Sequence, residues 1–211
     1  MNEEVDILEP PHFRPSGIIK SREQALKDGD WIGTFNLWVV RRTPEPAILY
    51  QQRSLQKSWA PGLLDLAAAG HYKAGEVLAD GLREAEEELG VQYDPNAMKY
   101  LGKRLFVDRD TNGYQRNNAI HVFIIEDDAP LNAYTLQQEE VEAICILPIH
   151  KLLKVHRDET YQFTAQALNN KGEKTAIAVT KESFPYNFDN YHYKMAVLAN
   201  RYFSGEEDLL Y

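Results

Sequence analysis

The chain has a single cysteine, Cys145, among its 211 residues. One thiol cannot form an internal disulfide, and it cannot supply a cluster of thiolate ligands to a metal ion. Cys145 lies within the apolar stretch Ala-Ile-Cys-Ile-Leu-Pro. This context predicts a buried, unreactive thiol. Folds held together by disulfides and thiol-based metal centres are therefore disfavoured.

Long apolar runs are also missing. The first residues, Met-Asn-Glu-Glu-Val-Asp-Ile-Leu, have neither the basic start nor the apolar core of a secretory signal. No later run approaches the roughly 18 apolar residues that a membrane-spanning helix needs. We therefore expect a soluble, cytoplasmic protein that has no membrane partner.

Basic residues are outnumbered by acidic ones. The chain has 23 lysines and arginines against 32 aspartates and glutamates, which gives a formal net charge of −9. A surface of this sign repels the phosphates of nucleic acid, so no nucleic-acid partner is expected. Hydrophobic residues make up 44% of the chain, which is enough to bury a sizeable core.

Periodicity predicts strands interleaved with helices. Segments rich in β-branched and aromatic residues predict strands at 34–42, 47–54, 100–107, 119–127 and 142–148. Residues 161–180 alternate on both sides of Asn-Asn-Lys-Gly and predict a hairpin. Helical patterns occupy residues 147–155 and 191–203. This order predicts an α/β (α+β) fold, a sandwich with a mixed β-sheet.

The chain contains no interdomain linker that composition can detect. Residues 1–30 are polar and interrupted by prolines, which predicts an N-terminal extension packed on the core. Residues 31–155 form the predicted core, and residues 156–211 add the hairpin and the C-terminal helix to the same domain. The aromatic residues of that last segment predict either a cap on the sheet or a homodimer contact.

Acidic residues crowd the segment before Gly90. Its apolar residues recur at i, i+4, i+7 and i+11, namely at Leu78, Leu82, Ala85 and Leu89. This spacing predicts one helix from about Val77 to Leu89, with Gly90 as its C-terminal cap.

Three carboxylates of this predicted helix share the face opposite the apolar stripe, because Glu84, Glu87 and Glu88 are spaced i, i+3 and i+4. A solvated surface helix is one interpretation. Against it, like charges at this spacing repel, and acidic groups near a helix C-terminus oppose the helix dipole. A hard divalent cation, Mg²⁺ or Mn²⁺, would reverse both penalties. The spacing alone leaves both interpretations open.

The same segment resembles the signature of the Nudix hydrolases, G-x5-E-x7-R-E-U-x-E-E-x-G-U, in which U is apolar. The matching residues are Gly70, Glu76, Arg83, Glu84, Ala85, Glu87, Glu88, Gly90 and Val91. One residue is missing between Glu76 and Arg83, where six residues replace the expected seven. The resemblance implies a Nudix-type α/β/α sandwich.

Residues 51–76 resemble the Nudix branch related to isopentenyl-diphosphate isomerase. Those isomerases use a cysteine just before the Gly-His pair, and this chain has Ala69 there. Alanine cannot exchange a proton, so hydrolysis is favoured over isomerisation. A noncatalytic nucleotide-binding Nudix module is a third possibility, although such modules commonly lose the carboxylates that this chain keeps.

The resemblance implies a Mg²⁺-dependent hydrolase, with Mn²⁺ as an alternative ion. Its partner would be a small organic diphosphate, such as a nucleoside diphosphate linked to a group X, and it would cleave the phosphoanhydride bond. Glu84, Glu87 and Glu88 would be catalytic and would bind the metal, together with the carbonyl of Gly70. Arg83 would pair with one of these carboxylates and orient it.

Further candidates are less specific. Glu139 and Glu140 precede a predicted strand, where they are either residues of a solvated loop or candidates for the general base, and of the two we prefer Glu140 as the base. Arg53 and Lys57 would neutralise phosphate, or they are ordinary exposed cations. Aromatic stacking on a base or simple packing remains open for Trp59 and Tyr72. The remaining candidates are His71, Tyr114 and Arg116, the last two in a polar loop at 109–118.

Overall fold

The computed structural model describes residues 3–109, 113–185 and 188–211. The strands are β1 (Glu4–Glu9), β2 (Arg14–Ser21), β3 (Trp31–Arg41), β4 (Ala47–Arg53), β5 (Leu64–Asp65), β6 (Ala68–His71), β7 (Lys99–Arg109), β8 (Gln115–Glu126), β9 (Val141–Pro148), β10 (Phe163–Asn169) and β11 (Lys174–Val179). The α-helices are α1 (Arg22–Asp28), α2 (Arg83–Leu89), α3 (Ile149–Arg157) and α4 (Tyr191–Phe203). Short 3₁₀ helices are η1 (Leu78–Leu82), η2 (Pro95–Ala97), η3 (Leu131–Ala133) and η4 (Lys181–Ser183). Within these described ranges, no helix has both the length and the apolarity of a membrane span.

Strand β3 is the centre of the sheet. One of its edges pairs in parallel with β8, from Trp31 opposite Asn117 to Val40 opposite Glu126. Its other edge is shared by β1, β6 and β4, which all run antiparallel to it. Parallel and antiparallel pairs therefore meet on one strand, and the predicted mixed sheet is confirmed.

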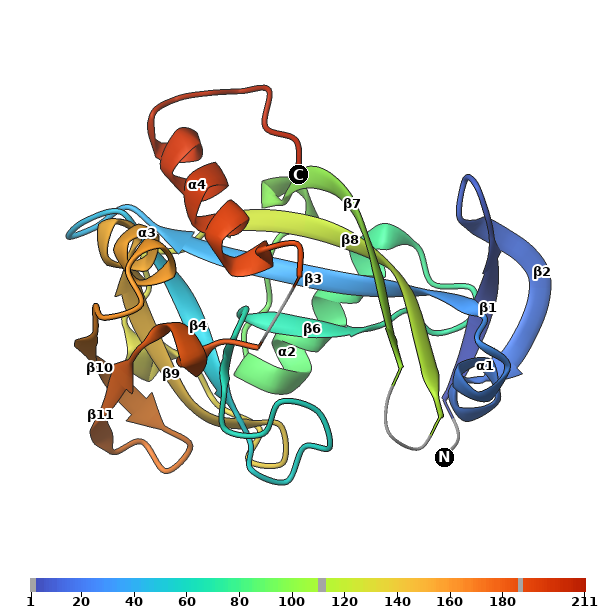
Figure 1. Ribbon diagram of the computed structural model, residues 1–211, viewed down its shortest axis with the longest axis horizontal. Coiled ribbons are helices and arrows are strands. Elements are labelled where there is room, and N and C mark those ends of the chain that lie inside the picture. The colour runs from blue at the N-terminus through green and yellow to red at the C-terminus, as the bar shows by residue number, and fades with distance from the viewer. Residues whose placement is uncertain (1–2, 110–112, 186–187) are drawn as a thin grey trace.

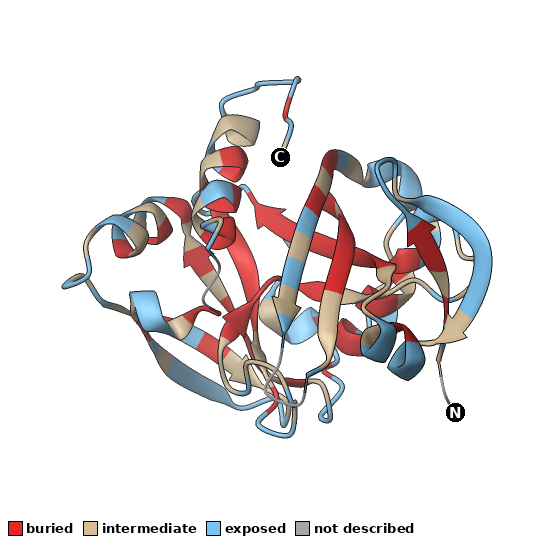
Figure 2. Cartoon of the chain, turned by 45° about the vertical axis from the view of Figure 1, so that its right-hand side comes forward, coloured by how far each residue is buried: buried red, intermediate tan, exposed pale blue. Residues whose placement is uncertain are grey.

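Helices cover both faces of this sheet, on different sides of β3 (Figure 1). Phe35, Leu37 and Val39 point to one face and share a core with residues of α2. Trp38 and Val40 point to the other face and share a core with residues of α3 and α4. Because strand side chains alternate between faces, a strand that is apolar at successive positions must be covered on both sides. Figure 2 shows the resulting band of buried residues along the central strands. The predicted sandwich is confirmed.

The first 30 residues are more regular than their polar composition indicates. They contain the hairpin β1–β2 and helix α1, and β1 joins the main sheet through Ile7 opposite Ile32. Val5, Ile7, Ala25 and Ile32 form a small separate core. Strand β2 escaped prediction because most of its residues are exposed and give no apolar alternation. The proposed boundaries at residues 30 and 155 stay a prediction.

The C-terminal segment covers the sheet. The hairpin β10–β11 extends the sheet beyond β9. Buried residues of α4, including Tyr191, Met195 and Ala199, belong to the same core as residues of α3. This arrangement agrees with the capping alternative, and a homodimer contact stays a prediction. Cys145 is fully buried on β9, and burial raises the pKa of its thiol to about 12, so the thiol is unreactive as expected.

The predicted helix from Val77 to Leu89 was wrong in its first half. Residues Leu78–Leu82 form the 3₁₀ helix η1, and the α-helix begins only at Arg83. Leu78 is 41% exposed and so lies outside the apolar stripe. Close approach to β3 explains the difference: a Cβ atom on Gly81 would lie 2.3 Å from the Phe35 ring. The predicted cap is correct, because Gly90 adopts φ = +66° and ends α2.

Replacing Gly81 with alanine should reveal this close approach. The added methyl group would overlap the fully buried Phe35 ring, so Gly81→Ala should lower the free energy of unfolding by about 3 kcal/mol. Gly172→Ala is the control, because its added methyl group meets no atom within 4 Å. Only its positive φ of +78° disfavours alanine, which should lower the free energy of unfolding by about 1 kcal/mol. Urea unfolding followed by circular dichroism measures both. Equal losses in the two variants would contradict the close packing.

Candidate active site

A cleft of about 990 Å³ opens beside β6 and α2 and brings together most of the candidates from the sequence. Those that line it are Arg53, Lys57, Trp59, Ala69, Gly70, His71, Glu84, Glu87, Glu88, Tyr114, Arg116 and Glu140. Tyr72, Glu76, Arg83 and Glu139 are not part of its lining. Residues 110–112 of the predicted polar loop at 109–118 lie outside the described residues.

Helix α2 supplies the acidic wall of the cleft. Glu84 and Glu88 are only 9% and 7% exposed, whereas the side chain of Glu87 is 48% exposed and lies nearer the rim. Gly70 on β6 makes room for the first of them, because a Cβ atom at this position would lie 2.0 Å from Glu84 Oε1. Any larger residue at position 70 would therefore displace the carboxylate.

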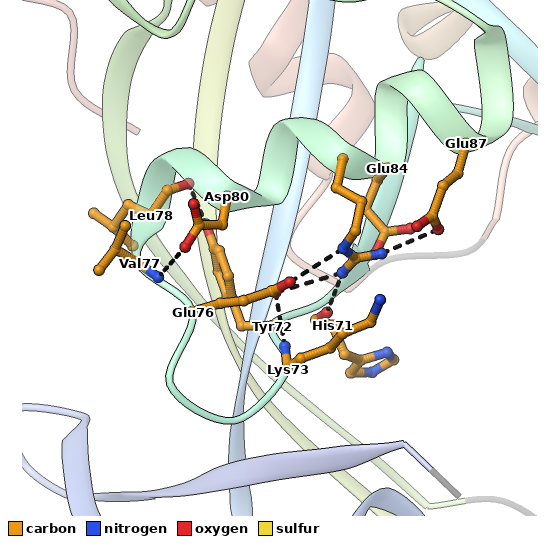
Figure 3. A network of polar contacts seen from close by, with 10 residues as sticks. His71, Tyr72, Lys73, Glu76, Val77, Leu78, Asp80, Glu84 and Glu87 are labelled. Carbon is orange, nitrogen blue, oxygen red and sulfur yellow. Dashed lines mark hydrogen bonds and ion pairs between the residues drawn. The ribbon is translucent and has the colours of Figure 1, made fainter. Parts of the chain in front are cut away.

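Arg83 does not line the cleft, but it forms ion pairs with two carboxylates of the acidic wall. Its Nη1 lies 2.9 Å from Glu84 Oε1 and 3.0 Å from Glu87 Oε2. Its Nε donates to Glu76 Oε1 at 3.1 Å, and Nη2 donates to the carbonyl of His71 at 3.4 Å. Figure 3 shows the carboxylates of Glu76, Glu84 and Glu87 arranged around this one guanidinium group. Glu76 thus reaches Arg83 despite the residue missing from the spacing.

Burial changes the acidity of the two inner carboxyl groups. It raises the pKa of Glu84 to about 7, with the charge of Arg83 opposing the shift. Burial and then the charge of Glu84 raise the pKa of Glu88 to about 8. Gln51 on β4 partly offsets this by donating from Nε2 to Glu88 Oε2 at 3.0 Å. Gln51 was not among the residues that the sequence pattern singled out; it is a buried amide that directly follows four buried residues of β4.

The acidic wall fits a hard divalent cation by its chemistry. Its donors are carboxylate oxygens, the ligands that Mg²⁺ and Mn²⁺ prefer. Among the residues that the structure describes, no three acidic, histidine or cysteine side chains already converge as a metal site. Arg83 instead lies between Glu84 and Glu87.

Two of the basic residues that line the cleft come from the end of β4 and the loop after it. Lys57 forms an ion pair with Glu140, which joins this loop to the segment before β9. Arg53 donates from Nε to the carbonyl of Trp59 at 3.1 Å, and its guanidinium lies 5.1 Å from the centre of the Trp59 ring. Asp65 is 3.6 Å from Arg53 Nη1. Both cations therefore face the cleft in defined positions.

The aromatic candidates and His71 differ in their contacts. Tyr72 packs edge-on against Phe35 and donates its hydroxyl to the carbonyl of Leu78 at 3.2 Å, which favours the packing alternative over contact with substrate. Trp59 does line the cleft, but its ring is already stacked by Arg53. Burial lowers the pKa of His71 to about 3, so its imidazole is neutral at physiological pH.

Known proteins resemble this chain over most of its length. The NUDIX domain pattern matches residues 34–167. An uncharacterized Nudix hydrolase of Clostridium acetobutylicum is 33% identical over 190 residues, covering 86% of this chain and 81% of that protein. The chain belongs to the Nudix family. An uncharacterized Nudix hydrolase of Pseudomonas aeruginosa is 42% identical over 137 residues, covering 64% of this chain and 73% of that protein.

Solved structures share the Nudix fold. A Deinococcus radiodurans protein superposes with a TM-score of 0.55 at 22% identity, covering 72% of this chain and 87% of its own. A MutT/nudix family protein of Enterococcus faecalis superposes with a TM-score of 0.50 at 17% identity, covering 82% and 62% respectively. At these identities the likeness concerns the fold alone.

Family membership makes this Nudix protein a hydrolase that acts on pyrophosphate bonds. The resemblance to the isomerase-related branch is a finer statement, and it stays a prediction. Among the Nudix signature residues, Glu76, Glu84 and Glu87 bind Arg83, and Gly70 lies against Glu84.

Gly70→Ala should impair the candidate active site without destabilising the fold. The new methyl group would meet the end of the Glu84 side chain, which can swing away without disturbing the core. We expect pyrophosphate hydrolysis to fall by about 100-fold or more, the size of effect that follows a misplaced catalytic group. Steady-state rates and thermal unfolding measure the two properties. Wild-type rates in a folded Gly70→Ala protein would show that the position of Glu84 is unimportant.

Proposed function

We propose that this Nudix protein is a Mg²⁺-dependent diphosphatase, with Mn²⁺ as an alternative ion. Its substrate would be a nucleoside diphosphate linked to a group X, or a related small organic diphosphate. One observation carries the proposal: the buried carboxylates of Glu84 and Glu88 face the same cleft as the basic Arg53 and Lys57. Such a cleft can hold a cation and a dianionic group side by side.

The metal ligands would be Glu84, Glu87, Glu88 and the carbonyl of Gly70. When bound, the ion would supply neutralisation of the diphosphate charge and a lowered pKa of coordinated water. Arg83 would position these carboxylates without touching substrate, because it binds Glu84 and Glu87 from outside the cleft lining.

Arg53 and Lys57 would bind the phosphate oxygens of the substrate, with Asp65 and Glu140 holding the two cations in place until substrate arrives. Hydrolysis breaks one phosphoanhydride bond. The oxygen of a water molecule forms a bond to phosphorus, and the bridging oxygen leaves with the electron pair on the second phosphate. Glu140 would accept the proton that the water loses, because its carboxylate lines the same cleft as the acidic wall.

Two alternatives receive less support. An isomerase needs a proton-exchanging group at position 69, and Ala69 lines the cleft without one. A noncatalytic binding module needs no intact acidic wall, whereas this chain keeps Glu84, Glu87 and Glu88 in the cleft.

The acidic wall can be tested with neutral, isosteric changes. Glu87→Gln and Glu88→Gln should each lower kcat by about 100-fold or more, equivalent to roughly 3 kcal/mol in the barrier. Glu86→Gln is a matched control on the same helix, because Glu86 is exposed, bonds to Gln92 and does not line the cleft. Phosphate release is measured with Mg²⁺, and again after EDTA removes the ion.

The assay should cover nucleoside triphosphates, sugar nucleotides, dinucleoside polyphosphates, coenzyme A, thiamine diphosphate and prenyl diphosphates. Proposed metal dependence predicts that EDTA abolishes release and that added Mg²⁺ restores it. Rates that match wild type in both cleft variants would refute the assignment. Binding without turnover of any member, with Mg²⁺ or Mn²⁺, would favour the binding module instead.

The choice of base has its own test. Glu140→Gln should reduce kcat by about 100-fold while changing KM little, as expected for loss of general-base assistance. Glu139→Gln is the neighbouring control, since Glu139 does not line the cleft. If both variants keep more than half of the wild-type kcat, the base lies elsewhere.

A further inference from the structure

The cleft has a floor made of four adjacent strands. His71 on β6 lies opposite Thr34 on β3, Thr34 lies beside Ile120 on β8, and Ile120 lies opposite Arg104 on β7. All four residues line the cleft. Neighbouring strands are about 4.8 Å apart, so the floor extends ~10 Å from β6, which carries Gly70, to β8. An organic group attached to a diphosphate at the acidic wall would lie across this floor.

Two buried polar atoms on the floor have no partner. Thr34 is 8% exposed and Asn118 is 9% exposed, and both line the cleft. Thr34 Oγ1 and Asn118 Oδ1 make no hydrogen bond within the described part of the chain. His192 Nδ1 on α4 also lines the cleft without a partner. Most buried polar side chains in folded proteins have such a bond, so two exceptions on neighbouring strands of one floor call for an explanation. A bound ligand that pairs with both atoms provides one.

Charge on this part of the floor is already balanced. The Arg104 guanidinium is bound by both oxygens of Asp189, at 2.7 and 2.9 Å, and lies 4.0 Å from the centre of the Tyr191 ring. The cations proposed for phosphate come from elsewhere: Arg53 is the last residue of β4, and Lys57 lies in the loop that follows it. The floor therefore suits an uncharged polar group, whereas the wall and the loop suit the diphosphate.

The unpartnered atoms define the chemistry of that group. A carbonyl-type oxygen such as Asn118 Oδ1 accepts only, so the ligand must donate an O–H or N–H. The Thr34 hydroxyl can donate or accept. Buried Ile120 on β8 lies beside Thr34, two residues after Asn118, and offers an apolar patch. A sugar ring presents hydroxyl groups around an apolar face and meets each requirement. A hydrocarbon chain would cover both atoms and leave them without partners.

We propose that Thr34 and Asn118 form a specificity subsite for a hydroxyl-bearing, sugar-type substituent and that they disfavour a hydrocarbon substituent. This subsite rests on the proposed function, because it assumes that the diphosphate binds at the acidic wall.

Two uncleavable ligands test it in the presence of Mg²⁺: adenosine α,β-methylene diphosphate and geranyl methylenediphosphonate. Both carry a P–C–P bridge, so calorimetry measures their Kd whether or not the protein hydrolyses anything. Wild-type protein should bind the adenosine ligand at least 10-fold more tightly. Thr34→Val and Asn118→Leu should each weaken that ligand by 5-fold or more and change geranyl binding by less than 2-fold. Thr175→Val, an exposed change on β11, should alter neither.

A third ligand identifies the interacting groups. The 2′,3′-dideoxy form of the adenosine ligand lacks the ribose hydroxyls, so the two cleft variants should bind it about as well as wild type does. The proposal is overturned if wild type shows no preference for the adenosine ligand, or if each variant weakens both diphosphonates equally. A protein that prefers the adenosine ligand but hydrolyses none of the diphosphates would support the subsite and contradict the proposed function.

Discussion

Two buried carboxyl groups, those of Glu84 and Glu88, impose the main constraint on this molecule. Burying negative charge in a protein is costly unless it is matched, and their raised pKa values express that cost. The surrounding residues reduce it in different ways. Gly70 leaves space, Gln51 donates a hydrogen bond, and Arg83 brings a positive charge from outside the cleft. A cation arriving from the cleft would complete the compensation.

Strand β3 connects this site to the fold. One of its faces carries Trp38 and Val40 into the core beneath α4, and the same face carries Thr34 and Asn36 into the cleft. The boundary between core and cleft is marked by Tyr191, whose hydroxyl accepts from Asn36 Nδ2 at 3.0 Å and from Trp38 Nε1 at 2.9 Å. The floor of the cleft is thus the part of one sheet face that the C-terminal helix leaves uncovered.

Sequence patterns predicted the elements with strong periodicity and missed those without it. The apolar run around Trp38 and the amphipathic residues 191–203 form a strand and a helix as expected. Strand β2 is mostly exposed and gives no apolar alternation, so it was missed. Residues of η1 do follow the apolar pattern of a helix, but they form a 3₁₀ helix where Gly81 lies close to Phe35. The role of Tyr72 could not be predicted from the sequence either, because an aromatic residue next to the signature can contact substrate or pack against the core, as Tyr72 packs against Phe35.

By itself the sequence determined the Nudix signature, the spacing of its carboxylates on α2 and the mixed sheet that carries them. These features are local or periodic, so neighbouring residues in the chain suffice to specify them. Only the tertiary structure decided that Glu84 and Glu88 are buried, that Lys57 meets Glu140, and that Thr34 and Asn118 share a floor. Each of these depends on strands and loops far apart in the chain, and pairing between such segments is set by packing of the whole molecule.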